Sequence, residues 1–291
     1  MSIRYPSHEN CVNQPAARPA RRGLARVFLA LAVIVSLAAP TAAASGSPSH
    51  LAGTAPDDIA MNETKTATLV PGQYLGEAGE NFPWQPNVSV AAALPECPDQ
   101  GDPAIAIDAA GNAYAAWIGC DTSGDTVNFA FRPTGGPWGT SARVNDDANL
   151  GVTRYRPDIA VDGAGNVFVV WTDNRRGNDD IYFAHCPASG SWSATIRVNS
   201  DSGNAQQSMP AIAVHSAGHT YVVWQDSRNG HDDIYSAYRS PSGSWGSNLR
   251  VNDDSGNAAQ TSPDVAVDGS GNAYVVWGDS RHDSSDIFRC V

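Results

Sequence analysis

The sequence predicts an all-β protein, a β-propeller with four-stranded antiparallel blades, from three observations. A stretch of fifteen residues, 157–171, recurs at 210–224 and 263–277, with a looser copy at 103–117. The prolines that open these copies are 54, 53 and 53 residues apart, a period typical of propeller blades. Each copy also holds short apolar runs separated by turn residues, as strands do. The alternatives are a linear β-solenoid or a string of small sheets.

One copy of the repeat predicts four short strands. Ile159–Val161 precedes the turn sequence Asp-Gly-Ala-Gly-Asn, whose Gly and Asn residues accept positive φ angles. Val167–Trp171 is apolar at consecutive positions, as expected for a strand that is covered on both faces. Ile181–Ala184 predicts the third strand, and a turn leads to the fourth around Thr195–Val198. Such units arranged around an axis form a propeller.

The two ends of the repeat region predict how the blades close into a ring. Trp84 corresponds to the middle of a repeat, so Asn87–Ala92 takes the place of a fourth strand. Pro263–Val291 supplies a first, second and third strand. In one sheet these segments complete a fourth blade, and closure removes exposed sheet edges. The alternative is a fragment of a larger propeller, or a ring that another copy of the chain completes.

The N-terminal part of the chain predicts export. Residues 1–44 combine several arginines with the apolar run Val27–Ala39 and end in Ala-Ala-Ala, the pattern of a cleaved signal peptide. The apolar run is too short to span a bilayer comfortably. Residues 45–83 predict a flexible leader, and residues 84–291 predict the propeller domain. We therefore expect a secreted, extracellular or cell-surface protein that does not insert into the membrane after cleavage.

The charge of the chain excludes some classes of binding partner, and its cysteines predict a disulfide. Beyond residue 44 the chain has 13 basic and 29 acidic residues, which argues against nucleic acid and against anionic lipid as partners. An exported protein can oxidise its thiols. Cys97 and Cys120 lie in connections that emerge on the same face of a propeller, and we expect them to form a disulfide.

A repeated Asp-x-Arg motif follows the second strand and supplies the candidate ligand-binding residues. The candidates are Asp173, Arg175, Asp226, Arg228, Asp279 and Arg281. Arginine can hold a carboxylate or sugar hydroxyls with two parallel hydrogen bonds. The competing interpretation is structural, because a residue that recurs in nearly every blade is more often a scaffold residue than a catalytic one. The first blade has Gly119 and Asp121 at these positions.

Acidic loops on the same face supply candidate calcium ligands. These are Asp146, Asp147, Asp201, Asp253 and Asp254. Carboxylate oxygens are the ligands that calcium prefers. The competing interpretation is that Asp and Asn side chains order their own loops.

Two sets of tryptophans are expected to pack against other residues of the protein rather than to bind a ligand. Trp117, Trp171, Trp224 and Trp277 end the second strand of each copy, and they predict the core between blades. Trp138, Trp192 and Trp245 follow a hairpin glycine, and they predict packing anchors, although an exposed Trp could stack on a sugar ring.

The hairpins before the second tryptophan set resemble a known motif. Segments 134–138, 189–192 and 242–245 are similar to shortened Asp-boxes, Ser-x-Asp-x-Gly-x-Thr-Trp, which join third and fourth strands in sialidase-like propellers. The Asp of the motif is absent here, and the loop is shorter. The repeats also resemble those of uncharacterised bacterial exported propellers, over roughly 84–291.

The resemblance to sialidases implies three arginines, a Tyr–Glu nucleophile pair and an Asp acid/base. No Glu follows Glu96, so the repeats contain no Glu that could form a Tyr–Glu nucleophile pair. Two Asp carboxylates could still serve as the pair that glycoside hydrolysis needs. The leading prediction is an exported, non-catalytic binding module for a glycan or another extracellular ligand, such as a protein. The alternatives are a sialidase-like glycoside hydrolase, which could be incomplete, and a structural fragment of a longer surface protein.

Overall fold

All regular structure in the described part of the chain is β-structure. The computed structural model describes residues 73–75, 81–83, 87–90, 99–121, 124–147, 151–282 and 284–291. Among these residues no helix is long and apolar enough to cross a membrane. The predicted signal peptide lies outside the described residues, so export stays a prediction.

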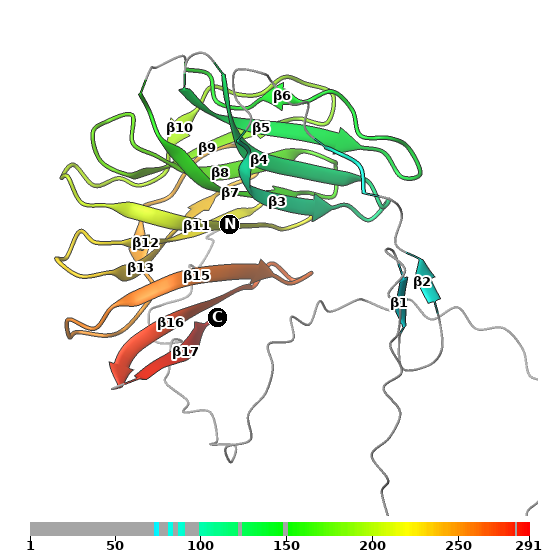
Figure 1. Cartoon of the computed structure of the whole chain (residues 1–291). Helices are drawn as coiled ribbons and strands as arrows, with labels where there is room; N and C mark the ends of the chain where they lie inside the picture. Colours follow the sequence, from blue (N-terminus) through cyan, green and yellow to red (C-terminus); the bar gives the residue numbers. More distant parts are fainter. Residues whose placement is uncertain are drawn as a thin grey trace, which may run out of the picture. The chain divides into compact units, whose positions relative to one another are not determined.

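Four antiparallel sheets follow the four copies of the repeat (Figure 1). Blade 1 contains β3 (Gly101–Ile107), β4 (Ala113–Asp121), β5 (Gly124–Arg132) and β6 (Ala142–Arg143). Blade 2 contains β7 (Arg154–Val161), β8 (Val167–Asp173), β9 (Asp180–Cys186) and β10 (Ile196–Arg197). Blade 3 contains β11 (Gln207–Val214), β12 (Thr220–Asp226), β13 (Asp233–Arg239) and β14 (Leu249–Arg250). Blade 4 contains β15 (Gln260–Val267), β16 (Ala273–His282) and β17 (Ser284–Cys290).

The strands of each sheet are ordered as they follow in the chain, so each blade is an antiparallel meander. The first strands β3, β7, β11 and β15 contact one another in that sequence, and the sheets stack in chain order (Figure 1). The four sheets are the blades of a β-propeller. The predicted fold class is therefore confirmed.

The turn between the first and second strands, which the sequence predicts from its Gly and Asn residues, is held by an aspartate. In blade 2 the Asp162 carboxylate accepts bonds from the backbone N–H groups of Ala164 and Asn166, both at 2.9 Å. Gly165 has φ of 80°, which a residue without a Cβ adopts at little cost. The carboxylate therefore satisfies backbone donors that the sheet ladder leaves unpaired.

The fourth strand is only two residues long in blades 1 to 3, and a buried asparagine extends its attachment. The Asn of the repeated Arg-Val-Asn sequence accepts a hydrogen bond from a third-strand amide. The pairs are Asn145 with Val127, Asn199 with Ile181 and Asn252 with Ile234, at 2.9 to 3.0 Å. An amide side chain thus replaces a backbone rung, which explains why Arg-Val-Asn recurs.

Both tryptophan sets pack as expected. The four tryptophans that end the second strands are buried, and Trp171, Trp224 and Trp277 lie in the apolar clusters between successive sheets. Trp192 meets Phe129 of the preceding blade edge-on, with ring centroids 5.2 Å apart, and Trp245 meets Phe183 in the same way at 5.1 Å. These contacts are of the edge-to-face kind that aromatic pairs favour. The hairpins of blades 2 and 3 therefore anchor each of these blades to the one before.

Blade 4 differs from the other three, because its sheet has three strands among the described residues. Residues 87–90 contain no strand, and residues 91 and 92 lie outside the described residues. The predicted closure of blade 4 by the segment 87–92 therefore stays a prediction. So does the Cys97–Cys120 disulfide, because Cys97 lies outside the described residues.

A short hairpin lies in the stretch for which the sequence predicts no regular structure. Strand β1 (Gln73–Leu75) pairs antiparallel with β2 (Asn81–Pro83). This hairpin belongs to a separate compact unit from the blades. The domain boundaries at residues 44 and 83 stay predictions.

Candidate functional site

Each Asp-x-Arg pair lies at the end of a second strand and forms a closed polar cluster. In blade 3 the Asp226 carboxylate is fully buried and accepts bonds from Arg228 Nε at 2.9 Å and Nη2 at 2.6 Å. The indole N–H of Trp224 donates to it at 2.7 Å. The Arg228 guanidinium lies 4.1 Å from the centroid of the Tyr235 ring. One aspartate therefore fixes an indole and a guanidinium inside the blade.

Blades 2 and 4 repeat this cluster. The corresponding residues are Asp173, Arg175, Trp171 and Tyr182 in blade 2, and Asp279, Arg281, Trp277 and Phe288 in blade 4. Burial acts to raise the pKa of Asp279, but hydrogen bonds from Arg281 and Trp277 lower it more, so its pKa lies below the usual value. A hydrogen-bonded anion of this kind is stabilised by the fold and stays ionised.

Blade 1 lacks the cluster because Gly119 stands at the aspartate position. Asp121 instead pairs with Arg143 at 2.8 Å, with both side chains about one-third exposed. In the other blades the aspartates are fully buried, so a ligand could reach only the outer edges of the arginines. Ligand binding by the Asp-x-Arg residues stays a prediction.

Hydrogen bonds and arginines already engage the five candidate calcium ligands. Asp147 pairs with Arg154 and with Arg175, and Asp253 lies 2.8 Å from Arg281. The remaining three accept bonds from amide groups, namely Asp146 from Thr195, Asp201 from Asn199 and Asp254 from Gly256. In the described part of the chain, no group of three or more His, Cys, Asp or Glu side chains is arranged to hold a metal ion. Calcium binding stays a prediction.

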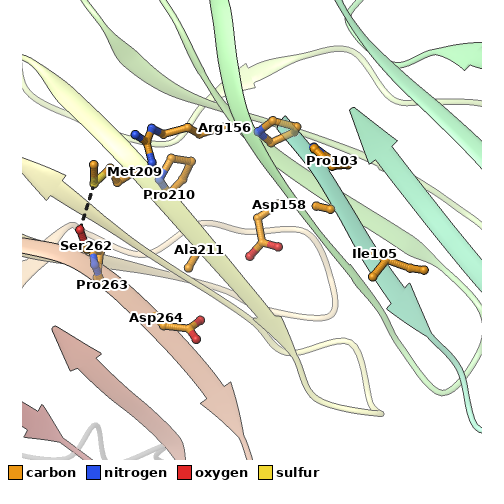
Figure 2. A pocket seen from close by; sticks show the side chains of 12 residues that line it. Pro103, Ile105, Arg156, Asp158, Met209, Pro210, Ala211, Ser262, Pro263 and Asp264 are labelled. Carbon is orange, nitrogen blue, oxygen red and sulfur yellow. Dashed lines mark hydrogen bonds between the residues drawn. The ribbon is translucent and has the colours of Figure 1, made fainter. Parts of the chain in front are cut away.

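A pocket of about 430 Å³ lies where the four first strands converge (Figure 2). We call it the axial pocket. Its walls are the same short segment of each blade, around the repeated proline. The lining residues are Pro103, Ala104, Ile105, Arg156, Pro157, Asp158, Met209, Pro210, Ala211, Ser262, Pro263 and Asp264. The pocket is a wide, open depression whose surface is polar and apolar in about equal measure.

Two carboxylates line this pocket from non-adjacent blades. Asp158 comes from β7 and Asp264 from β15, with Ala211 of β11 between them (Figure 2). Burial raises the pKa of Asp158 to about 6, and the negative charge of Asp264 adds to that effect. Hydrogen bonds from the amides of Ile212 and Ile159 act in the opposite direction. The pocket thus holds a carboxyl group that titrates near neutral pH beside a second carboxylate that is exposed.

The rim of the pocket is built from strained backbone. Asp102, Arg156, Met209 and Ser262 each precede the repeated proline and have φ between 48° and 53°. They are all the non-glycine residues with positive φ in the described part of the chain. Each sits at a register shift in the pairing of the first two strands of its blade. Bulges of this kind redirect side chains and are frequent beside functional sites.

The axial pocket is not predicted by any motif of the sequence, although the repeat contains a signal for it. The positions just before and just after the repeated proline change from blade to blade. They read Asp102 and Ala104, Arg156 and Asp158, Met209 and Ala211, and Ser262 and Asp264. Positions that vary within an otherwise constant repeat are the ones that can give each blade a different role.

This chain is similar to solved structures of low sequence identity. No protein-family model and no curated protein matches this chain. Among solved structures, a protein of unknown function from Dyadobacter fermentans is 11% identical with a TM-score of 0.48, over 65% of this chain and 59% of that one.

Two other similar structures are described as carbohydrate-active enzymes. An alpha-L-arabinofuranosidase from Fusarium graminearum is 14% identical with a TM-score of 0.46, over 65% of this chain and 60% of that one. An endo-arabinase from Bacteroides thetaiotaomicron is 13% identical with a TM-score of 0.40, over 65% and 73%. These likenesses carry no argument about ligand or activity, and the propeller assignment rests on the sheets themselves. The resemblance to sialidases stays a prediction.

Proposed function

We propose that this protein is an extracellular binding module that takes a glycan, or a small ligand of similar polarity, in the axial pocket. The observation that carries the proposal is the variation of polar groups around the pocket. Asp158, Arg156, Ser262 and Asp264 all line it, whereas the equivalent positions of the remaining blades carry other residues. Such an asymmetric set can orient a ligand, which a ring of identical residues cannot do.

The chemistry of the pocket suits a polyhydroxylated ligand. Carboxylate oxygens accept hydrogen bonds from hydroxyl groups, and a guanidinium donates to their oxygens. The exposed Pro103 ring and the side chains of Ile105 and Met209 offer apolar surface to the C–H faces of a sugar ring. The volume of about 430 Å³ lies within the range of small-molecule sites.

The hydrogen bonds of Asp158 favour binding over hydrolysis. Its Oδ1 accepts from the Ile159 amide at 2.9 Å, and its Oδ2 accepts from the Ile212 amide of the next blade at 2.8 Å. Both oxygens are therefore engaged with backbone, and the side chain links two blades. A catalytic carboxyl needs a free oxygen for the substrate.

Glycoside hydrolysis is the second candidate, and one observation favours it. The raised pKa of Asp158 and the exposed Asp264 carboxylate, in one pocket, are the two kinds of group that glycosidases use as acid and as base or nucleophile. In that case Asp158 would donate the proton and Asp264 would act as the base or nucleophile.

A glycan-array screen with variants in each candidate region tests both functions. We expect Asp264→Asn to weaken binding of any glycan at least tenfold, because an ionised acceptor on the pocket wall is lost. Arg228→Ala tests the Asp-x-Arg site, and a chelator tests calcium. Asp286→Asn is the matched control, since this exposed aspartate belongs neither to the pocket lining nor to the candidate ligand and calcium residues.

The outcomes separate the candidates. Binding that survives Asp264→Asn but is lost in Arg228→Ala would move the site to the Asp-x-Arg face. Release of sugar from the bound glycan, abolished by Asp264→Asn, would favour the hydrolase. A folded protein that binds no glycan at all would contradict the proposed function.

A further inference from the structure

Neighbouring blades pack through two equivalent faces that recur along the chain. We call the face that contacts the following blade the forward face, and the opposite one the backward face. In blade 1 the forward face includes Tyr114, Ala116 and Val127, which pack against Ile159 and other residues of blade 2. The same arrangement joins blades 2 and 3 and blades 3 and 4. The chain therefore contains three examples of one interface.

The forward face of blade 4 is exposed. Its residues Tyr274, Val276 and Ile287 are 41%, 40% and 78% exposed. In blade 3 the residues at the last two of these positions, Val223 and Ile234, are 1% and 0% exposed. The side chains are of the same kind, so the difference arises because none of the described sheets packs on the forward face of blade 4. An exposed apolar patch of this kind marks an interaction surface.

The backward face of blade 1 is exposed along its first strand. Ile105 and Ile107 of β3 are 63% and 65% exposed. In the following blades the residues equivalent to Ile105 are nearly fully buried, namely Ile159, Ile212 and Val265. The other described apolar residues of this face are largely covered: Ala113, Trp117 and Ala130 are 7%, 7% and 0% exposed, so the open part of the face is the edge formed by β3.

One hydrogen bond between neighbouring blades has equivalent donor and acceptor groups on blades 1 and 4. The Asp158 carboxylate of blade 2 accepts the Ile212 amide of blade 3 at 2.8 Å. Asp264 occupies the same position in blade 4 and accepts the amide of Val265 in its own strand. In the repeat, the residue that corresponds to Ile212 at the open end is Ile105. The carboxylate and the amide are thus a complementary pair on the two open faces.

We propose that the protein self-associates head to tail, with the forward face of blade 4 of one copy on the backward face of blade 1 of another. The second copy is the occupant because the chain already shows the interface three times, and the forward face of blade 4 and the β3 edge of the backward face of blade 1 are both exposed. The faces are different, so the contact is heterologous, and it either closes a ring of copies or extends a filament. The proposed contact involves Ile105 and Asp264, which also line the axial pocket, so the variants that test it are placed at residues outside the pocket.

Variants on the two faces test the proposal by light scattering after size exclusion. We expect the purified protein to be oligomeric, and Ile287→Asp and Ile107→Asp each to be monomeric, because each buries a charge in the interface. Neither residue lines the axial pocket. Leu249→Asp is the matched control: this apolar side chain is also exposed, but it lies on the short edge strand β14, so it should leave the oligomer intact.

A mixing experiment is specific for a heterologous contact. The Ile287→Asp copy keeps an intact backward face, and the Ile107→Asp copy keeps an intact forward face. An equimolar mixture should therefore form a one-to-one dimer that grows no further. Val276→Asp provides a second variant if Ile287→Asp fails to fold. A monomeric wild-type protein, as expected if another segment of the chain covers these faces, would overturn the proposal, and so would folded single variants that do not combine.

Discussion

The Asp-x-Arg clusters and the axial pocket are both built from equivalent positions of successive blades, yet they differ in how those positions are filled. Blades 2, 3 and 4 repeat the same aspartate, arginine and tryptophan, and each aspartate is buried with its hydrogen bonds satisfied. Around the pocket, Ala104, Asp158, Ala211 and Asp264 alternate at one position. The polar residues that recur in successive blades form hydrogen bonds with one another inside a blade. The residues that differ between blades line the axial pocket.

The contrast teaches where to look for function in a repeat protein. A cluster that recurs in three of the four blades meets a structural need that those blades share, namely to fix the end of the second strand. A position whose residue changes between blades is not required for the structure of each blade, so it can serve a ligand. The following four predictions test this distinction, in order of the expected effect.

Removing a cluster aspartate should cost the most stability. Asp279→Ala leaves the Arg281 guanidinium and the Trp277 indole N–H without their acceptor in a buried site. Breaking a buried pair from one side costs about 3–5 kcal/mol, measured as the free energy of unfolding in urea. A loss below 1 kcal/mol would show that the cluster is not structural.

Asp158 should make the protein less stable as pH rises. Its pKa is raised to about 6 from 3.8, so the folded state holds this proton more tightly than the unfolded chain does. The stabilisation is complete below about pH 4 and is lost as pH rises through about 6. Relative to Asp158→Asn, the wild-type unfolding free energy should fall by about 2–3 kcal/mol over this range.

Asp279 provides the control of opposite sign. Its pKa is lowered, so its contribution is present above its ordinary pKa and is lost as pH falls through the folded value. Urea titrations of Asp158→Asn and Asp279→Asn across pH 3 to 7 should therefore deviate from wild type in opposite directions. Deviations of the same sign would contradict the assignment of the two environments.

The exposed partner of the same arginine should matter little. Asp253 lies 2.8 Å from Arg281, as a second anion beside Asp279, but its side chain is 44% exposed. Exposed ion pairs contribute about 0.2–1 kcal/mol. Asp253→Ala should therefore lower the unfolding free energy by less than 1 kcal/mol, and added salt should reduce the effect further. A loss equal to that of Asp279→Ala would show that burial does not set the difference.

The pocket carboxylate Asp264 should have the smallest effect on folding. It is exposed, and its one contact is to an amide of its own strand. Asp264→Asn should change the unfolding free energy by less than about 0.5 kcal/mol while it lowers ligand affinity. Equal stability with lost binding is the signature of a residue kept for a ligand, whereas a large loss of stability would assign it to the scaffold.

Much of the fold could be predicted because the repeat is local. The turn of Asp162, the apolar run at Val167–Trp171 and the tryptophan anchors are set by nearby sequence and by the blade spacing. The pocket could not be predicted in this way. Asp158 and Asp264 are 106 residues apart, and neither belongs to a motif with a known chemical spacing. Only the convergence of the first strands brings them to one cavity.

The sequence by itself determined the blade, because four strands, their turns and their mutual packing are encoded once and then repeated. The tertiary structure decided which of the repeated residues are buried and which are exposed. Ile234 and Ile287 have identical side chains at the same position of the repeat, and one is covered while the other is open. Burial depends on what packs against a residue, and that neighbour comes from the next blade rather than from the residue's own sequence.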